Sequence, residues 1–445
     1  MYFCLCRLPL ALVPLFTIWG TACGEDLPAN QTISFSSQVA PILQTRCVAC
    51  HGENLAESDY RMDSFAALVA KTSSDQPAVV PSKAKNSELY QRLVHQDEDL
   101  RMPSEAAALP EEEIELIRRW IEQGAVFDGD SRDALLTHLL PVHNHPAAPP
   151  TYRASIPISA LAVFGDENRI YVGGYHEITV WNTAGELLNR IGNQGERTYS
   201  IEPDPTGEWL LSASGTPGIM GEVRIFDLAS GKMHAVVTRT DEAILDAQYS
   251  PDGKRIAVGL PNGVIDIYSA KTLTKEATLL GHSEQVTSVH WHADSNRLGT
   301  TSRDNAAKIY DVNTGRSIST FAGHSDCVNS LAFLDGNDVI TVSDDGKAII
   351  WSVADGRKNR EVVSGPTSLL DVARFDRHYW ITSTQGAQQF EIGSHRRLVQ
   401  LQSEGVWVTT VAKNKLPDLR IFGLHSGELI VRQGEQEMPR IVARP

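Results

Sequence analysis

Apolar residues recur at helical spacing in two stretches of the first 130 residues. The first stripe consists of Phe35, Val39, Ile42 and Leu43, and the second of Ile114, Ile117 and Ile121. Intervals of three and four residues place side chains on one face of a helix. Pro110 and three glutamates precede the second stripe, as is typical of a helix start, and Gly124 can end that helix. A shorter helix is expected over residues 87–94. We therefore predict a small all-α domain.

A twelve-residue apolar run, Leu8 to Trp19, follows Arg7 near the N-terminus. It is shorter than the roughly 20 residues that a membrane-spanning helix needs. With the small residues at 20–22, the run predicts a signal peptide over residues 1–23, export to the periplasm or cell envelope, and no integral membrane segment after signal removal. A membrane anchor is the alternative. So is a lipoprotein anchor on Cys23, although Gly20 stands where such signals usually carry leucine.

Beyond residue 152 the pattern changes to short apolar runs that are typical of strands. An aromatic residue stands near the third strand of each repeat, at Trp181, Phe226, Tyr268, Tyr310, Trp351 and Phe390. These positions follow one another at steps of 39 to 45 residues, and a further step of 42 reaches Val431-Arg432 in a weak seventh copy. A period of about 40–45 residues built from strands indicates a WD-type β-propeller. We predict an all-β propeller of about seven blades over residues 153–445.

The residues between these two parts, 131–152, are rich in proline, with Pro141, Pro146, Pro149 and Pro150. Proline at this density does not build regular structure, so the segment is expected to be a linker. It also contains His138, His143 and His145. Three histidines could hold a metal ion, but a flexible polar linker is the simpler interpretation.

The charge is negative and unevenly distributed. The chain of 445 residues has a formal net charge of −15, which argues against nucleic acid or an anionic membrane as the main partner. Residues 24–130 hold 19 acidic and 9 basic residues, and therefore most of the excess. This asymmetry suggests a domain boundary near 130.

The strongest chemical signal is Cys47-Val48-Ala49-Cys50-His51. Cys-x-x-Cys-His is the attachment pattern of haem c: each thiol adds to one vinyl group of the porphyrin, and the histidine that follows can ligate the iron. A thioredoxin-like redox pair would need a βαβ context, and a zinc site would need two more ligands nearby; the sequence offers neither. Beyond the signal, Cys327 is the one other cysteine, so no disulfide framework is expected. We predict one covalently attached haem c over residues 24–130.

The iron also needs a sixth ligand or an open position. The candidate is Met102, in a loop before the last helix, because a thioether raises the reduction potential and suits electron transfer. Met62 is an alternative, although an apolar core role is the simpler interpretation of its context. His95, at the end of the expected helix over 87–94, is another, and an open position is the last.

Residues 35–128 resemble the planctomycete-type cytochrome c domain. The matching motifs are Phe35…Val39-Ala40-Pro41-Ile42-Leu43, Cys47 to Gly52, Met62-Asp63-Ser64, Pro81-Ser82, Ser87-Glu88-Leu89, Met102-Pro103-Ser104 and Trp120-Ile121…Gly124-Ala125. Ser82 and Ser104 depart from the family pattern. The resemblance implies that Cys47 and Cys50 form the thioethers, and that His51 and Met102 are the axial ligands of the iron.

The repeats resemble the WD-repeat family over nearly 300 residues. Gly281-His282 and Gly323-His324 match its Gly-His pair, and Asp304 and Asp345 each stand six residues before the aromatic of their blade. In that family the histidine, the aspartate and the aromatic form a hydrogen-bonded network that stabilises a blade. Because both pairs recur at repeat positions, we interpret His282 and Asp304 as structural and not catalytic.

Three functions fit these features. The first is electron transfer through a single haem, with a redox partner protein and the propeller as a protein-docking platform. The second is an oxidoreductase or other enzyme with its active site on the propeller, coupled to the cytochrome. The third is a haem-based redox or gas sensor. Residues 153–445 contain no nucleophile motif, metal-ligand cluster or phosphate loop, which favours an electron carrier or binding protein over an enzyme.

Overall fold

The computed structural model of the chain describes residues 32–48, 50–52, 60–70, 78–104, 107–129, 132–133, 136, 144–164, 169–403, 405–412, 416 and 418–443. The predicted signal peptide, and His138 and His143 of the proline-rich segment, lie outside these residues. Within the described residues, no helix is both long and apolar enough to cross a bilayer.

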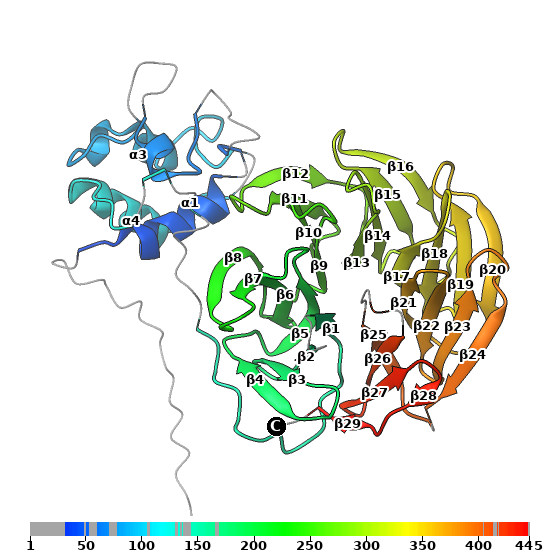
Figure 1. Cartoon of the computed structure of the whole chain (residues 1–445). Coiled ribbons are helices and arrows are strands. Elements are labelled where there is room, and N and C mark those ends of the chain that lie inside the picture. The colour runs from blue at the N-terminus through cyan, green and yellow to red at the C-terminus, as the bar shows by residue number, and fades with distance from the viewer. Residues whose placement is uncertain are drawn as a thin grey trace, which may run out of the picture.

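The elements described before residue 130 are helices (Figure 1). They are the π-helix η1 Phe35–Val39, α1 Ala40–Arg46, α2 Phe65–Leu68, the 3-10 helix η3 Ala84–Asn86, α3 Glu88–Leu93 and α4 Glu111–Glu122. The two predicted stripes lie on η1–α1 and on α4. Three glutamates occupy the first turn of α4, and Gly124 ends it with a φ of +100°, a conformation that favours glycine.

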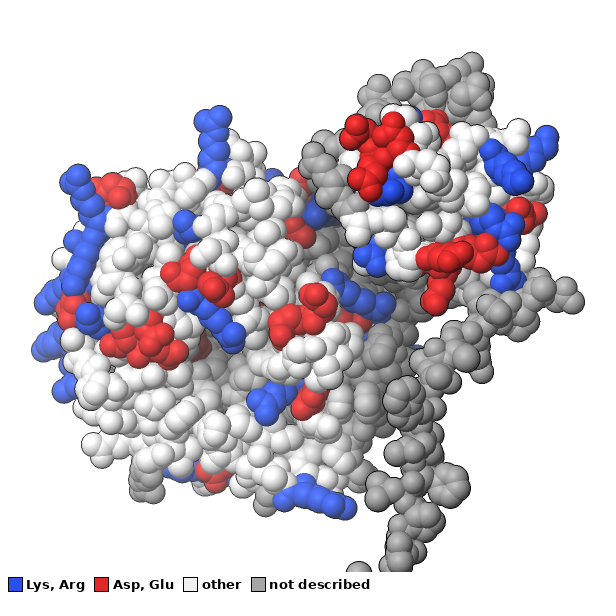
Figure 2. Space-filling view, turned by 180° about the vertical axis from the view of Figure 1, so that it is seen from behind, with Lys and Arg blue, Asp and Glu red and all other residues white. Residues whose placement is uncertain are grey.

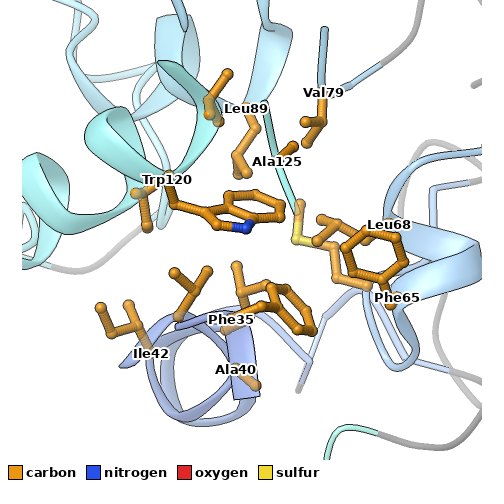
Figure 3. Packing of buried hydrophobic residues seen from close by; sticks show 14 of the residues in the cluster. Phe35, Ala40, Ile42, Phe65, Leu68, Val79, Leu89, Trp120 and Ala125 are labelled. Atoms are coloured by element: carbon orange, nitrogen blue, oxygen red, sulfur yellow. The ribbon is translucent and has the colours of Figure 1, made fainter. Parts of the chain in front are cut away.

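Aromatic side chains fill the centre of this helical part (Figure 3). The ring of Phe35 meets that of Phe65 edge-on at 4.9 Å between centroids, and that of Trp120 at 5.2 Å. Trp120 is fully buried, and its indole N–H donates to the carbonyl of Val126 at 3.0 Å. Farther along the chain, Leu136 is also fully buried in the same core, and its N–H donates to the carbonyl of Asp63 at 2.8 Å. Packing of the helical part therefore continues beyond residue 130.

From residue 161 the chain forms seven antiparallel sheets arranged as the blades of a ring (Figure 1). The first four blades are β1 Leu161–Phe164, β2 Arg169–Gly173, β3 Ile178–Trp181 and β4 Leu187–Ile191; β5 Arg197–Pro203, β6 Trp209–Thr216, β7 Met220–Asp227 and β8 Met233–Thr240; β9 Asp246–Tyr249, β10 Arg255–Gly259, β11 Ile265–Ser269 and β12 Lys275–Leu279; and β13 Val286–Trp291, β14 Arg297–Ser302, β15 Ala307–Asp311 and β16 Arg316–Phe321. Each sheet keeps its strands in chain order, so every blade is one continuous segment.

The last three blades complete the ring. They are β17 Val328–Phe333, β18 Asp338–Ser343, β19 Lys347–Ser352 and β20 Lys358–Ser364; β21 Leu369–Phe375, β22 His378–Ser383, β23 Gly386–Glu391 and β24 Arg397–Gln402; and β25 Val408–Val411, β26 Leu419–Leu424 and β27 Glu428–Gln433, with β28 Gln436–Glu437 and β29 Ile441–Val442 both paired to β27. The six predicted aromatics all lie in third strands, and Val431 lies in the third strand of the seventh blade. The predicted seven-bladed propeller is therefore confirmed.

Apolar layers between neighbouring blades stabilise the ring. One cluster joins Ile265 and Ile267 of β11 to Val289 and Leu298 of the next blade. Another closes the ring between the seventh and the first blade, where Ile158 packs with residues of both and donates its N–H to the carbonyl of Leu424 at 3.2 Å. Burial of these alternating side chains gives the sheets their main stabilisation.

Carboxylates on three of the innermost strands also connect neighbouring blades. Glu202 accepts a hydrogen bond from the N–H of Tyr249 at 2.8 Å, and Asp246 accepts one from the N–H of Val289 at 2.9 Å. Asp371 belongs to the same set, because its two oxygens accept from the N–H of Val372, the hydroxyls of Ser330 and Thr410, and the N–H of Val411. These satisfied carboxylates fix the relative register of the inner strands.

Candidate functional site

The Cys-x-x-Cys-His motif lies at the C-terminal end of α1. The N–H of Cys47 still donates to the carbonyl of Leu43 at 2.9 Å, as in the preceding helix. The chain then turns tightly, because the N–H groups of Cys50 and His51 both donate to the carbonyl of Cys47, at 3.2 and 2.9 Å. The turn keeps the two thiols and the imidazole within one short, hydrogen-bonded segment. This segment follows directly after the helix that the first apolar stripe predicts.

The two thiols are free and differ in their surroundings. Cys50 is exposed, whereas Cys47 is partly buried and packs against the helical core. Burial, together with repulsion from Cys50 and Glu113, raises the pKa of the Cys47 thiol to about 12, although Arg46 opposes the shift. Redox-active dithiol pairs instead have one thiol with a lowered pKa. The raised pKa therefore does not suit Cys47 as the attacking thiol of a thioredoxin-like pair.

The imidazole of His51 is held in one tautomer. Its Nδ1 lies 3.1 Å from the carbonyl oxygen of Tyr60, and because a carbonyl can only accept, Nδ1 carries the proton. The lone pair is then on Nε2. Metal-ligating histidines usually have their second nitrogen oriented in this way by a carbonyl or a carboxylate. The N–H of Met62 also donates to the carbonyl of His51 at 2.6 Å, so residues 60–62 hold both the ring and the backbone of His51.

The three candidates for the sixth ligand lie in different environments. Met62 is 6% exposed and packs in the helical core, as its sequence context indicated. The ring of His95 accepts a hydrogen bond at Nδ1 from the N–H of Asp97 at 3.1 Å. Met102 lies between α3 and α4 and is partly exposed, with its N–H bonded to the carbonyl of Arg92 at 3.0 Å. The loop that carries Met102 is therefore fixed to α3, and its assignment as the ligand stays a prediction.

The donor groups of this region suit haem c. Two free thiols stand at the required spacing on one turn, and the adjacent imidazole has its δ nitrogen protonated and its ε nitrogen available as a donor. A thioether is present in a separate, backbone-anchored loop. Among the described residues, no group of three or more His, Cys, Asp or Glu side chains could hold another kind of metal ion.

The repeat histidines of the fourth and fifth blades form equivalent buried networks. His282 donates from Nδ1 to Asp304 at 2.9 Å and accepts at Nε2 from the hydroxyl of Thr300 at 2.8 Å. His324 has the same contacts with Asp345, at 3.0 Å, and Thr341, at 2.9 Å. Burial lowers the pKa of both histidines, although the aspartates oppose the shift. The recurrence of one geometry in two blades supports the structural interpretation.

The aromatics take part in these networks differently from the expectation. The hydroxyl of Tyr310 donates to the carbonyl of Leu280 at 3.2 Å, and not to the histidine or the aspartate. The indole nitrogen of Trp351 has no hydrogen-bond partner among the described residues, and its ring stacks on Phe321 at 5.4 Å. Threonine takes the third position of the network, and the aromatic contributes by packing.

One buried cluster was not predicted from the sequence. Glu222 at the start of β7 accepts hydrogen bonds from Arg224 at 2.6 Å, from Nε2 of His145 at 2.8 Å, and from Arg239. The side chains of Glu222, Arg224 and His145 are at most 3% exposed. The linker histidine is therefore part of the packed propeller, which corrects the expectation of a flexible linker at this residue. His145 and Glu222 are 77 residues apart, and neither stands in a motif, so no sequence pattern indicates the pair.

Residues 144–152, which we call the strap, bind the propeller at further points. The carbonyls of Pro149 and Pro150 accept from Arg190, and Tyr152 donates to Glu177 at 2.5 Å. A cavity of about 430 Å³ lies between the strap and the first blade. Its charged lining groups, Glu177 and Arg190, pair with each other at 2.6 Å. The cavity therefore reflects the attachment of the strap and does not offer free charges to a ligand.

The second blade differs from the sequence interpretation in its longest hairpin. The glycines and the proline of the stretch from Ser214 to Gly221 predict an exposed loop, with Ile219 and Met220 as apolar contacts for a partner. Instead β6 and β7 pair as far as Thr216 and Met220, so only residues 217–219 form the turn. Ile219 is 68% exposed at its tip, whereas Met220 is partly buried.

Comparisons with known proteins agree with this division of the chain. Residues 47–105 match the family model of planctomycete cytochrome C, and residues 273–311 and 315–352 match that of the WD domain, G-beta repeat. The WD repeat-containing protein slp1 of Schizosaccharomyces pombe is 35% identical over 71 residues, which are 16% of this chain and 14% of that protein. The chain thus spans about a seventh of the length of that relative.

Solved structures show the same propeller fold. A chain of the mitotic checkpoint complex matches with a TM-score of 0.56 and 16% identity, over 66% of this chain and 98% of that chain. The computationally designed Ika8 protein matches with a TM-score of 0.53 and 20% identity, over 65% of this chain and 88% of that chain. At these identities the likeness shows the fold alone. The chain therefore joins a planctomycete-type cytochrome c region to a seven-bladed β-propeller with WD repeats.

Proposed function

We propose that the protein is an exported electron carrier with one covalently attached haem c, and that its propeller docks a protein partner. The family matches support a haem protein with a protein-interaction platform. Single attachment, electron transfer, export to the periplasm or cell envelope and the identity of the ligands are the parts that we add. The apolar run Leu8 to Trp19 behind Arg7 is the basis for export.

The observation that carries the proposal is the orientation of His51. Its Nδ1–H donates to the Tyr60 carbonyl, which leaves Nε2 as the donor atom, one residue after Cys50. Cys47 and Cys50 would supply the two thioether bonds, His51 would be the first axial ligand, and Met102 the second. Haem, when bound in this way, supplies a one-electron couple whose potential depends on its axial ligands.

The residues around the motif perform the supporting tasks. Tyr60 fixes the tautomer of His51 through its carbonyl, and its own hydroxyl donates to the carbonyl of Leu68 at 2.9 Å. The bond from Met62 N–H to the His51 carbonyl restrains the turn. These contacts limit the movement of the imidazole, and a restrained ligand changes little in geometry between two redox states. This property suits an electron carrier more than an enzyme that must open a position for substrate.

The test is whether haem stays with the denatured polypeptide after maturation in the periplasm. We expect haem staining on a denaturing gel, because thioether bonds survive denaturation. Cys47→Ser and Cys50→Ser should each weaken retention, and His51→Ala should abolish the low-spin spectrum while some attachment remains. Cys327→Ser is the matched control, since Cys327 is a half-buried thiol in the propeller, and it should retain full staining. Haem that acid acetone extracts from the wild-type protein would contradict the proposal.

A further inference from the structure

The antiparallel order of the strands divides the propeller loops between two faces. In each blade, the turn between the second and third strands and the link to the next blade emerge on the same side. We call this side the connection face. The first-to-second and third-to-fourth turns emerge on the opposite side, which we call the hairpin face.

The described loops of the connection face are strongly acidic. Between β1 and β27 they contain a single basic residue, Arg303, against nine carboxylates, Glu177, Glu196, Asp241, Glu242, Glu284, Asp304, Asp326, Asp344 and Asp345. A second base, the exposed Arg153, stands in the segment that enters β1. Some of these carboxylates are in buried pairs, but Asp241, Glu284, Asp326 and Asp344 are exposed. The described loops of the hairpin face are closer to balance, with ten carboxylates and six lysines or arginines. Exposed bases such as Lys358 and Arg397 lie on the outer strands β20 and β24. Figure 2 shows basic side chains gathered along one edge of the molecule, at the left of that view.

The connection face also carries apolar side chains that a partner could cover. In the propeller loops, the exposed large apolar residues are Tyr175, Ile219, Leu280 and Trp407, at 38%, 68%, 68% and 45% exposure. All four stand in connection-face loops. Trp407 lies in the link into the seventh blade, Tyr175 and Ile219 lie in turns of the first and second blades, and Leu280 lies in the link after the third blade. The four loops therefore follow one another around the ring. The other exposed large apolar residues of the described propeller lie on outermost strands.

The backbone that carries one of these side chains and the ring of another have defined contacts. Glu242 accepts from the N–H of Gly218 at 2.9 Å and so holds the turn that carries Ile219. The ring of Trp407 lies 4.9 Å from that of His425, centroid to centroid. Fixed anchors lose little conformational freedom on binding, and rigid aromatic residues often contribute most to an interface.

The strap brings the haem region to this face. The N–H of His145 donates to Asn193 at 2.9 Å, and Asn193 lies in the connection-face loop between the first and second blades. On the other side, Leu136 is buried in the helical core. The eight residues between Leu136 and His145 reach at most about 30 Å when fully extended, at roughly 3.3–3.6 Å per residue. The haem region is thus restricted to the neighbourhood of the connection face.

The haem region and the connection face both carry an excess of negative charge. Residues 24–130 carry 19 acidic and 9 basic residues, and the face has nine carboxylates against two arginines. Like charges disfavour a contact between the two acidic surfaces, whereas both surfaces attract a partner of positive charge. The chemistry that fits is a protein with a basic surface around apolar side chains.

We propose that the connection face binds a protein with a lysine- and arginine-rich surface and thereby places it within reach of the tethered haem region. This inference rests on the proposed function, because it assigns the docking role to one face and one class of partner. Acidic residues would set the association rate and the salt dependence. Tyr175, Ile219, Leu280 and Trp407 would supply the apolar contacts.

The probe is an 18-residue peptide of alternating lysine and leucine, with a photoreactive benzoylphenylalanine, and its glutamate-for-lysine counterpart is the control. Binding to the full haem-loaded chain is measured by fluorescence anisotropy. We expect the lysine peptide to bind more than tenfold more tightly than the glutamate peptide, less so at high salt. Glu284→Lys with Asp326→Lys should weaken binding at least tenfold. Asp335→Lys with Asp355→Lys, the charge-matched pair on the hairpin face, should change it less than twofold.

The apolar contribution is tested in the same way. Trp407→Ser should weaken binding several-fold, whereas Leu398→Ser on the outer strand β24 should not. In the wild-type chain the photoreactive group should crosslink to residues 217–219, 280–285 and 403–407. Equal weakening by both lysine pairs, or crosslinks mainly in hairpin-face loops, would overturn the proposal. Haem retention on a denaturing gel is read in the same samples, so a failure of the haem assignment is distinguishable from a failure of the docking face.

Discussion

Glu222→Gln should strongly destabilise the propeller, because the substitution removes one charge from a buried cluster. The side chain of Arg224 is fully buried and that of Glu222 is 1% exposed. The amide keeps the shape but leaves Arg224 without its counter-charge. Removing one partner of a buried ion pair typically costs about 3–5 kcal/mol, since the remaining charge stays out of water.

The pKa of Glu222 gives an independent magnitude. Burial by itself would raise this pKa, but the hydrogen bond from His145 and the charges of Arg224 and Arg239 outweigh burial and hold the pKa at about 2. Against an ordinary value of 4.5, this difference corresponds to roughly 3 kcal/mol of stability at pH 7. Because the folded-state pKa is depressed, this contribution is fully present above pH 4.5 and is lost as the pH falls towards 2.

The assay is urea unfolding of the full chain, followed by the β-sheet circular dichroism signal at pH 7 and at pH 3. At pH 7 the variant should lose about 3 kcal/mol of unfolding free energy relative to wild type. The difference should shrink at pH 3, because there the wild-type Glu222 carboxyl is protonated in the unfolded chain but still mostly ionised in the folded one. Glu435→Gln, at an exposed carboxylate, is the control and should change little. A loss below about 1 kcal/mol at pH 7 would refute the reasoning.

Three further predictions concern the strap, the repeats and the ligand. A fragment of residues 144–445 should be more stable to heat and protease than one of residues 153–445, because only the longer fragment keeps the His145–Glu222 bond. Equal stability of the two fragments would show that the strap does not contribute. His282→Ala should lower the melting temperature. Since burial lowers the pKa of His282, the contribution of this histidine to the stability of the wild-type protein should weaken as the pH falls below 6.5. An unchanged melting temperature in the variant would contradict the structural role. Met102→Ala should remove the near-infrared band of sulfur–iron charge transfer and lower the reduction potential of the haem. Met62→Ala should keep the band but lower the free energy of unfolding by about 2–5 kcal/mol, because it leaves a cavity in the core. The reverse pattern would assign the ligand to Met62.

The propeller could be predicted because its sequence repeats. The first six blades each place an aromatic residue in the third strand, so a single weak period identified six positions that the structure confirms. The seventh blade lacks that aromatic, and extrapolation of the period to Val431 still located its third strand. Repetition averages over local irregularities, which is why degenerate blades did not obscure the fold.

The strap could not be predicted, because its contacts depend on the folded ring. Proline density correctly excluded helix and strand at residues 144–152, but lack of regular structure does not imply lack of order. The contact between His145 and Glu222 exists only in the folded ring. It contributes to stability because Glu222 also neutralises the fully buried Arg224. Similarly, the role of the Tyr60 carbonyl in orienting His51 is a backbone contact that no side-chain pattern records.

The length of the strap's connection determines how the two parts can cooperate. A haem region confined within about 30 Å of its anchor has an effective concentration at the connection face on the order of 10 mM. A partner that is bound at this face therefore meets the haem region frequently, even if the two have only a weak mutual contact. The haem region does not need a high-affinity surface of its own, and its acidic character can provide orientation alone. In the function proposed above, partner docking and electron exchange would then take place on different surfaces of one chain, and a change to one surface would leave the other intact.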